Sequence, residues 1–348
     1  IVKKNKFFGV YMEIMGLNTA FEKKLLTNAK KKCKTIVLPE AGINEQVLLA
    51  GLMCAENKIA KIVMLVSDNT LIEKHKVKES DYLRVVDINT SELLPMLVNA
   101  LYLKRKEKGL TEDGARDLLK NPIYFGTMMV ELGLCDGQTG GATYTSADAL
   151  RPALQIIKGK TPQSLISSYM IMISDDKKYG DNGVILLSDC GLNVNPTADN
   201  LCQICFDTVN SARNIAGFKN PIVAMLSYST LGSAEGDSAI KVRTATQLIK
   251  EKNPDFIVDG EMQFDSAVVP SVCARKAPNS PVKGNANVFI FPDLQSGNIS
   301  YKIIQRLAGF KCIGPITQGF RKPVNDLSRG ADANEVVRAI AITALQCD

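Results

Sequence analysis

The chain has few aromatic residues, no tryptophan and a single histidine. Aromatic side chains make up 6% of the residues, which leaves little for stacking on nucleic-acid bases, so we expect no nucleic-acid partner. The histidine, His75, lies in the charged segment Glu-Lys-His-Lys, which argues against Ser–His or Cys–His catalysis. No apolar run reaches the roughly 20 residues of a membrane span, and we see no signal-peptide pattern, so no membrane association is expected.

The cysteines are nine in number and scattered along the chain. An odd, dispersed set is typical of reduced thiols, so we predict a cytoplasmic protein rather than one with a disulfide framework. Cys202 and Cys205 have the C-x-x-C spacing of a zinc or redox site, but the sequence around them predicts the first turns of a helix and no second ligand pair follows. We interpret them as core-facing thiols and expect no metal site.

Length and charge indicate a globular protein with room for two domains. The chain has 348 residues, of which 45% are hydrophobic and 22% charged, with a net charge of +6. Lysines concentrate in the first 110 residues, a distribution that suits nucleic acid, a membrane surface or a small polyanionic metabolite as partner. We interpret the residues before Met12 or Met15 as an extension that takes no part in the fold.

Short β-branched runs alternate with longer amphipathic segments, which predicts an α/β fold with largely parallel sheets. Most predicted helices begin beside Ser, Thr, Asn or Asp, as capping requires. The predicted strands are Thr35–Leu38, Lys61–Val66, Arg84–Ile88, Tyr169–Ile173, Val184–Leu187, Ile222–Leu226, Phe256–Val258, Val288–Phe291 and Cys312–Ile313. The predicted helices are Gln46–Glu56, Glu92–Lys108, Thr111–Lys120, Ile123–Leu132, Ala147–Lys158, Thr197–Ala216, Ser238–Lys252, Asn298–Ala308 and Asn334–Leu345.

The domain boundary is placed at the turn-rich segment 159–162, because strand-rich sequence resumes after it. We predict a first α/β domain of residues 1–158 plus 315–348, with the last helix returning to it, and a second of residues 159–314. Ligands of such folds bind where the carboxyl ends of the strands meet, so we expect the active site in a cleft between the domains.

Two turn-rich segments have the composition of anion-binding sites. Segment 314–319 is followed by 323–330, which ends in adjacent Ser328 and Arg329 just before the last predicted helix. Segment 135–152 has Gly140 and Gly141, where backbone can approach a ligand closely, and hydroxyls and an arginine follow at the next helix start. Each segment could equally be an ordinary loop, with its serine or threonine satisfying nearby backbone.

A set of motifs from about Leu26 to the C-terminus resembles the phosphate acetyltransferases of the phosphate acetyl/butyryl transferase family. In order and spacing they are very specific, although some are weak individually. They comprise Thr35–Glu40, the Gly-Gly-Ala to Arg-Pro-Ala-Leu-Gln-Ile-Ile block of 140–157, Asn195–Thr197, Leu226–Thr230 with Gly232–Ala234, Asp259–Asp265, Pro292–Leu294 with Gly297–Asn298, and the Pro-Val-Asn-Asp-Leu-Ser-Arg-Gly block of 323–330.

The resemblance implies reversible transfer of an acetyl group between coenzyme A and inorganic phosphate, by thiolate attack on the acyl carbon in a ternary complex. It further implies a homodimer of subunits with two three-layer α/β/α domains, similar in architecture to isocitrate and isopropylmalate dehydrogenases. No metal or tightly bound cofactor is expected, since coenzyme A and acetyl-CoA are substrates. Phosphate butyryltransferase activity, and a non-catalytic protein that binds coenzyme A or acetyl phosphate, remain alternatives.

Matching positions carry the family's functional residues. Arg329 would hold the phosphoryl group and Ser328 would hydrogen-bond the reacting carbonyl or its tetrahedral intermediate. Arg105 would meet a phosphate of coenzyme A, and Arg151 is a second anion-binding arginine. The remaining predicted substrate-binding residues are Thr145, Ser146, Gly140, Gly141 and Asn325.

The general base is the uncertain position, because the family has an aspartate seven residues after the serine and this chain has Glu335. A glutamate can perform the same proton transfer if the geometry adjusts to one more methylene. Asp332 and Glu335 also form a D-x-x-E variant of a capping box, so Glu335 is predicted as base, as helix cap, or as both. Among other carboxylates, Asp259, Glu261 and Asp265 are interpreted as lining the cleft or as structural rather than as metal ligands.

Overall fold

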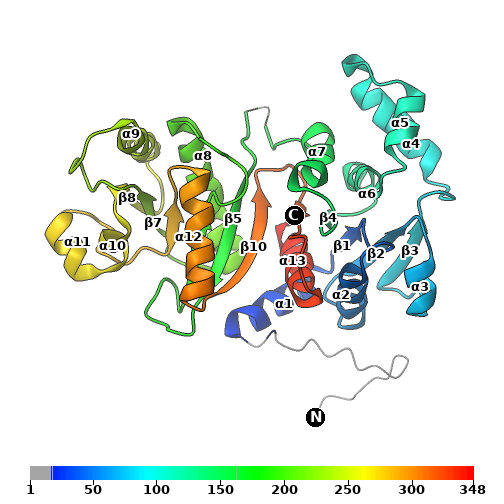
Figure 1. The fold of residues 1–348 in the computed structure, drawn as a ribbon, viewed down its shortest axis with the longest axis horizontal. Helices are drawn as coiled ribbons and strands as arrows, with labels where there is room; N and C mark the ends of the chain where they lie inside the picture. Colours follow the sequence, from blue (N-terminus) through cyan, green and yellow to red (C-terminus); the bar gives the residue numbers. More distant parts are fainter. Residues whose placement is uncertain (1–16, 18, 162) are drawn as a thin grey trace, which may run out of the picture. The chain divides into compact units, whose positions relative to one another are not determined.

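The computed structural model describes residues 17, 19–161 and 163–348, so the extension predicted before Met12 or Met15 lies outside the described residues. The chain forms two compact units (Figure 1): the described residues up to Ile157 together with Lys322–Asp348, and Lys158–Arg321. The predicted boundary after residue 314 falls inside strand β10 (Lys311–Gln318). Since β10 pairs with β5 (Ser167–Ile173) as far as Gln318, residues 315–321 belong to the second unit.

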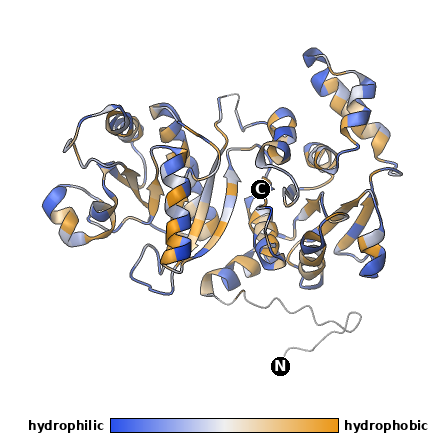
Figure 2. Cartoon of the chain, viewed as in Figure 1, coloured by the Kyte–Doolittle hydropathy of each residue, from blue (hydrophilic) through white to orange (hydrophobic). Residues whose placement is uncertain are grey.

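The first unit has a five-stranded sheet in the order β11-β4-β1-β2-β3. All four pairings are parallel, and β1 and β2 are buried almost throughout, as expected for a sheet covered on both faces. Figure 2 shows β1 and β2 mainly in the apolar colour. In this order the strands are Val324–Asp326, Gly137–Gly140, Thr35–Leu38, Lys61–Val66 and Leu83–Asp87.

Helices cover both faces of this sheet. Helix α13 contacts both α1 and α2, and helices α4, α6 and α7 form a second contiguous group. Helices α13 and α6 each contact β1 and β4 (Figure 1). The arrangement is a three-layer α/β/α unit, which confirms the predicted fold class. The bounds are α1 Ala20–Lys32, α2 Glu45–Glu56, α3 Thr70–Lys74, α4 Leu94–Arg105, η1 Lys106–Lys108, α5 Glu112–Leu118, α6 Pro122–Glu131, α7 Ser146–Ile156 and α13 Ala333–Gln346.

The second unit has a six-stranded, largely parallel sheet in the order β10-β5-β6-β9-β7-β8. Strands β10 and β5 pair antiparallel, as do β5 and β6, and the other pairings are parallel. Its core includes the buried side chains of Met172, Leu187 and Phe289. The remaining bounds are β6 Val184–Ser188, β7 Ile222–Leu226, β8 Ile257–Met262, β9 Val288–Ile290, α8 Ala198–Ser211, η2 Ala212–Ala216, α9 Asp237–Glu251, α10 Phe264–Val268, α11 Pro270–Lys276 and α12 Leu294–Leu307.

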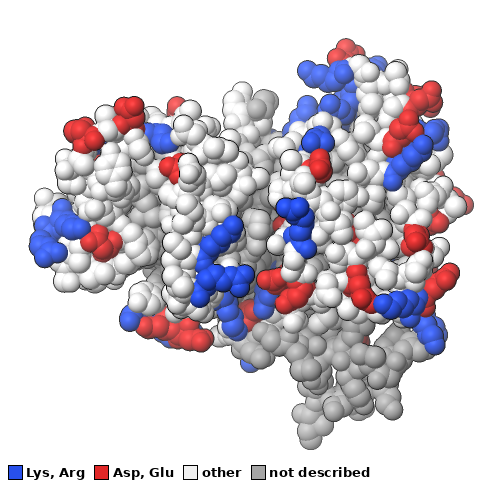
Figure 3. All heavy atoms as spheres, in the orientation of Figure 1, with Lys and Arg blue, Asp and Glu red and all other residues white. Residues whose placement is uncertain are grey.

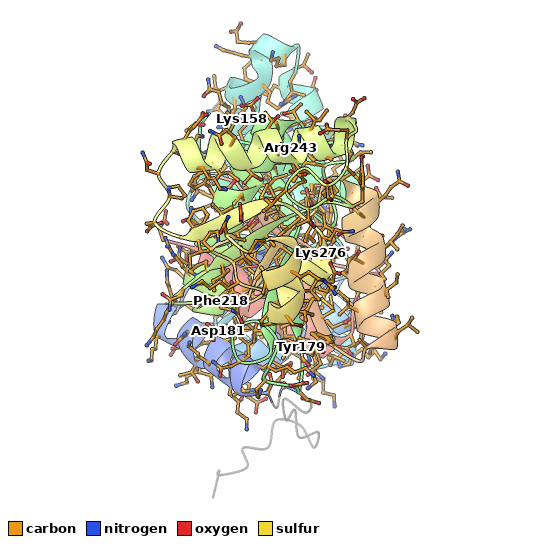
Figure 4. All side chains as sticks on the ribbon, turned by 90° about the vertical axis from the view of Figure 1, so that its left-hand side faces the viewer. Lys158, Tyr179, Asp181, Phe218, Arg243 and Lys276 are labelled. Carbon is orange, nitrogen blue, oxygen red and sulfur yellow. The ribbon has the colours of Figure 1, made fainter. Side chains whose placement is uncertain are left out.

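The three carboxylates that resemble a metal cluster in sequence are each engaged with a different cation. Their partners are Lys250 for Asp259 at 2.6 Å, Arg243 for Glu261 at 3.0 Å and Lys276 for Asp265 at 2.7 Å. Arg243 and Lys276, labelled in Figure 4, belong to α9 and α11. Each carboxylate is thus held in an ion pair within the second unit. Cys202 and Cys205 lie buried in α8 as free thiols.

Acidic and basic groups are interspersed on the face of the molecule drawn in Figure 3. Among the described helices, none is long and apolar enough to cross a membrane.

Candidate active site

Two turns of the first unit leave neighbouring strands at the same edge of the sheet. Strand β4 ends at Gly140 and β11 ends at Asp326, and these two residues are partners in the parallel pairing. The Leu327 N–H continues the ladder by donating to the Gly140 carbonyl at 2.8 Å. The turn 141–145, which leads into α7, and the turn 327–332, which leads into α13, therefore begin side by side, where ligands of parallel sheets bind.

The amides of the turn after β4 are occupied by a carboxylate of the protein itself. Glu40, which follows β1 and is completely buried, accepts from the N–H groups of Gly141, Ala142 at 2.9 Å and Thr143 at 2.6 Å, and from the Thr143 hydroxyl. The sequence predicts these backbone donors as a cradle for a substrate anion. In the structure, the Glu40 carboxylate occupies these donors. The observed role of Gly140 and Gly141 is therefore to allow the path of the backbone through the turn.

Gly141 has a backbone conformation and surroundings that no other residue fits. Its φ is +110°, and a Cβ there would lie 2.0 Å from Oδ1 of Asp326 and 3.0 Å from the Leu327 nitrogen. Burial raises the pKa of Asp326 to about 6; a hydrogen bond with Ser146 opposes that rise, and the Glu40 carboxylate adds to it. Asp326 is not among the site residues predicted from the sequence. Its position two residues before Ser328 is the one sequence feature that could have indicated it.

The two hydroxyl residues at the start of α7 have different surroundings. The Thr145 hydroxyl caps the helix, because it accepts from the Asp148 N–H at 3.2 Å and donates to the Asp148 carboxylate at 2.7 Å. Ser146 is the exposed first residue of α7 and reaches Asp326. The amino end of this helix is the natural position for an anion near Ser146.

Arg105 and Arg151 come together around α6. At the end of α4, Arg105 donates to the Gln155 carbonyl at 3.2 Å, while Arg151 on α7 pairs with Asp148 at 3.0 Å and is 55% exposed. Burial raises the pKa of Tyr124 on α6, and the positive charges of Arg151 and Arg105 partly offset that rise. Two of the predicted anion-binding arginines thus act on one tyrosine, although they are 46 positions apart in sequence.

Ser328 and Arg329 are exposed in the turn between β11 and α13. The Ala331 N–H donates to the Ser328 carbonyl at 3.0 Å, which closes the turn and leaves both side chains at its surface. Among the described residues, no ion pair or hydrogen bond holds the Arg329 guanidinium. Its donors are therefore available to a phosphoryl group.

The family model described as phosphate acetyl/butaryl transferase matches residues 20–344. The chain belongs to this family. It is 45% identical to a phosphate acetyltransferase of Acetivibrio thermocellus over 327 residues, which covers 94% of this chain and 98% of the relative.

The fold is also shared with solved structures. A phosphotransacetylase from Streptococcus pyogenes has a TM-score of 0.85 at 39% identity, with 93% of this chain and 98% of that chain covered. A 4-hydroxythreonine-4-phosphate dehydrogenase from Klebsiella pneumoniae has a TM-score of 0.51 at 14% identity, over 90% of this chain and 98% of that one. The second likeness shows the fold alone and agrees with the predicted dehydrogenase-like architecture.

Two residues predicted from the family pattern have clear structural roles. Glu335 completes a capping box: one of its carboxylate oxygens accepts from the Asp332 N–H at 3.0 Å, and its own N–H donates to Asp332 at 2.8 Å. The buried Asn325 amide donates to Thr343 at 2.8 Å and to Gln346 at 2.6 Å, both on α13. Asn325 thus ties β11 to α13, and a direct contact with substrate stays a prediction.

Proposed function

We propose that this member of the phosphate acetyl/butaryl transferase family catalyses the reversible reaction of acetyl-CoA with phosphate to give acetyl phosphate and coenzyme A. The observation that carries the proposal is the Ser328–Arg329 turn, which begins beside the turn that leads into α7. An uncommitted guanidinium and a helix amino end suit a substrate whose reacting part is an acyl phosphate. The 45% identity to a phosphate acetyltransferase supports the acetyl group as the one transferred.

The chemistry follows from which charges develop. The thiolate of coenzyme A attacks the acetyl carbon, the carbonyl oxygen gains negative charge, and the bond to the phosphate oxygen then breaks to release phosphate. Arg329 holds the phosphoryl group and stabilises the leaving phosphate, and the Ser328 hydroxyl donates to the oxyanion. Removal of one such donor typically costs about 3 kcal/mol of transition-state stabilisation, or roughly a hundredfold in rate.

Arg105 and Arg151 serve the anionic ends of the substrates. We assign Arg105 to a phosphate of coenzyme A, because its guanidinium is anchored at one nitrogen by the Gln155 carbonyl and keeps further donors. Arg151 is half-exposed beside the start of α7, and an incoming anion can compete with Asp148 for it. Ser146 and the Thr145 turn line the phosphoryl end.

Glu335 is proposed as the group that takes the thiol proton, with the cap as its competing role. The variant Glu335→Gln separates the two, because the amide oxygen can still accept from the Asp332 N–H but cannot take a proton. If Glu335 is the base, kcat of Glu335→Gln should fall a hundredfold or more while its melting temperature stays unchanged. Full activity in this variant would reduce Glu335 to a cap. The matched variant Asp332→Ala weakens the cap and leaves the carboxylate.

The test of the function is direct: acetyl phosphate and coenzyme A are mixed with the purified chain, and thioester formation is followed by absorbance. Catalytic formation of acetyl-CoA is expected. Binding of coenzyme A without turnover would instead support a non-catalytic protein. The same assay with butyryl phosphate measures acyl preference, and a higher kcat/KM for the butyryl substrate would overturn the acetyl assignment.

The remaining proposals concern the state of the protein. We propose a cytoplasmic homodimer without a tightly bound cofactor or metal. Support for a second copy comes from α12, where Ile299, Ile303 and Leu307 recur at intervals of four residues and are 55%, 51% and 84% exposed. Light scattering on the eluted protein measures the mass, and a monomer would contradict the homodimer. Activity lost after dialysis against a chelator, and restored by a metal, would contradict the expected independence from metals.

A further inference from the structure

The carboxyl group of Asp326 lies at the point where the two turns of the active site meet. Its side chain is almost fully buried, and Oδ1 has no hydrogen-bond partner among the described residues. The same oxygen lies over Gly141, where a Cβ would come within 2.0 Å of it. A buried carboxyl oxygen without a partner is costly to keep, and such a group beside a binding site calls for a functional account.

Among the described residues, none forms an ion pair with Asp326, and Arg329, three residues further along the chain, lies in the exposed turn. The Glu40 carboxylate, in the turn after β1, raises the pKa of Asp326 by its negative charge. Strand β4 contains no charged residue. On the other packed elements, Asp148 and Arg151 of α7 pair with each other, while Arg338 of α13 pairs with Glu22 and Glu335 caps α13. Helix α7 packs against β11, and its first residue, Ser146, is the hydroxyl neighbour that lowers the pKa of the Asp326 carboxyl by hydrogen bonding. When Asp326 is ionised, the Ser146 hydroxyl is therefore the principal hydrogen-bond donor to its carboxylate.

Ser146 has a single hydroxyl hydrogen, which can serve one acceptor at a time. When Asp326 is ionised, it can only accept, so it takes that hydrogen. When Asp326 is protonated, its O–H donates to Oγ of Ser146, and the Ser146 hydrogen is free to point at an anion at the amino end of α7. The protonation state of one buried carboxyl thus decides whether the exposed serine offers a donor or a lone pair.

We propose that Asp326 is a positioning residue that sets the direction of the Ser146 hydroxyl, and that the phosphoryl group binds at the amino end of α7 with Asp326 protonated. The inference deepens the proposed function and rests on it. No bond in the substrate is made or broken by Asp326; a proton moves from solvent to its carboxyl as the phosphoryl group binds. A second buried negative charge next to the phosphoryl group is thereby avoided.

The consequence is that phosphate binding takes up a proton near neutral pH. Burial and Glu40 place the pKa of free Asp326 at about 6, so the group is mostly ionised at pH 7.5 and must gain up to about one proton when phosphate binds. The apparent affinity for phosphate then falls by up to about tenfold per pH unit above 6.5. Phosphate itself titrates near this range, so the effect has to be separated by a matched variant.

Asp326→Asn supplies that variant, since its amide N–H donates to Oγ of Ser146 as the protonated acid does, and it does not titrate. Titration calorimetry with inorganic phosphate, in two buffers of different ionisation enthalpy, counts the protons taken up. At pH 7.5 the unaltered protein is expected to take up between half a proton and one proton more than Asp326→Asn. The Michaelis constant for acetyl phosphate should rise with pH more steeply in the unaltered protein than in the variant.

Ser146→Ala is the second arm and keeps the test valid if Asp326→Asn does not fold. It should bind phosphate more weakly below pH 6.5, where the serine of the unaltered protein offers its hydrogen, and take up fewer protons on binding than the unaltered protein does. Equal proton uptake in all three proteins would overturn the inference, as would equally pH-dependent Michaelis constants. If they still form acetyl-CoA in that case, the proposed function stands. If the unaltered protein formed no thioester, that result would instead contradict the proposed function.

Discussion

The buried carboxylate of Glu40 provides a quantitative test of how the turn after β4 is held. One of its oxygens accepts from Gly141 and Ala142, and the other accepts from the Thr143 N–H and hydroxyl. Glu40→Gln keeps the first oxygen and replaces the second by an NH₂ group. The Thr143 hydroxyl can rotate to accept from it, but the Thr143 N–H then faces another donor.

The magnitude follows from these contacts. A hydrogen bond to a charged group contributes about 1.5–3 kcal/mol, and the variant loses one such bond and the charge assistance of the others. The expected cost is about 3 kcal/mol in the free energy of unfolding of the first unit. At 2–4 °C per kcal/mol for a unit of roughly 150–250 residues, its melting temperature should fall by about 6–12 °C.

The assay is thermal unfolding followed by circular dichroism, together with hydrogen exchange of the amides of 141–143. The matched control is Glu107→Gln, the same chemical change on an exposed side chain of η1. Exchange at 141–143 should accelerate in Glu40→Gln only. A melting temperature within about 2 °C of that of the control would refute the reasoning that Glu40 holds this turn.

Three further predictions follow from the first unit. Because the folded-state pKa of Asp326 is about 6 and the unfolded value about 3.9, the folded state holds more protons between them, so stability is lost as pH rises through this window. In urea unfolding, the free energy of unfolding of Asp326→Asn should rise by about 2 kcal/mol relative to that of the unaltered protein between pH 4 and pH 7; a constant difference would contradict the pKa. Arg338→Ala removes the 2.8 Å partner of the buried Glu22 and should cost about 3 kcal/mol in urea unfolding, whereas a loss below about 0.5 kcal/mol would mean that the pair is not needed. Steady-state kinetics of Arg105→Ala should raise the KM for coenzyme A about tenfold and leave that for acetyl phosphate unchanged, and equal rises in both would contradict its assignment.

The sequence predicted the fold well where the usual patterns apply. Strands Thr35–Leu38 and Lys61–Val66 were placed to the residue because their β-branched runs are buried on both faces. The D-x-x-E pattern at the last helix predicted the capping box that the structure contains. These are local signals, in which propensity and packing favour the same structure.

The strands that border the site could not be predicted in this way. Strand β4 has the sequence Gly-Gln-Thr-Gly and β11 has Val-Asn-Asp, and neither has the β-branched run on which strand prediction depends. Their pairing alone brings Asp326 over Gly141. In the same way, Glu40 is more than 100 positions from the amides that it binds, so only the fold reveals its role.

The central claim is that the exposed Arg329 turn binds the phosphoryl group of an acyl phosphate. The most direct measurement compares initial rates of acetyl-CoA formation for Arg329→Ala and for Arg84→Ala, an exposed arginine on β3 at the opposite edge of the same sheet. Both variants should keep the melting temperature of the unaltered protein. The account predicts a loss of at least a hundredfold in kcat/KM for Arg329→Ala and less than threefold for Arg84→Ala. Similar, small losses in the two variants would contradict it.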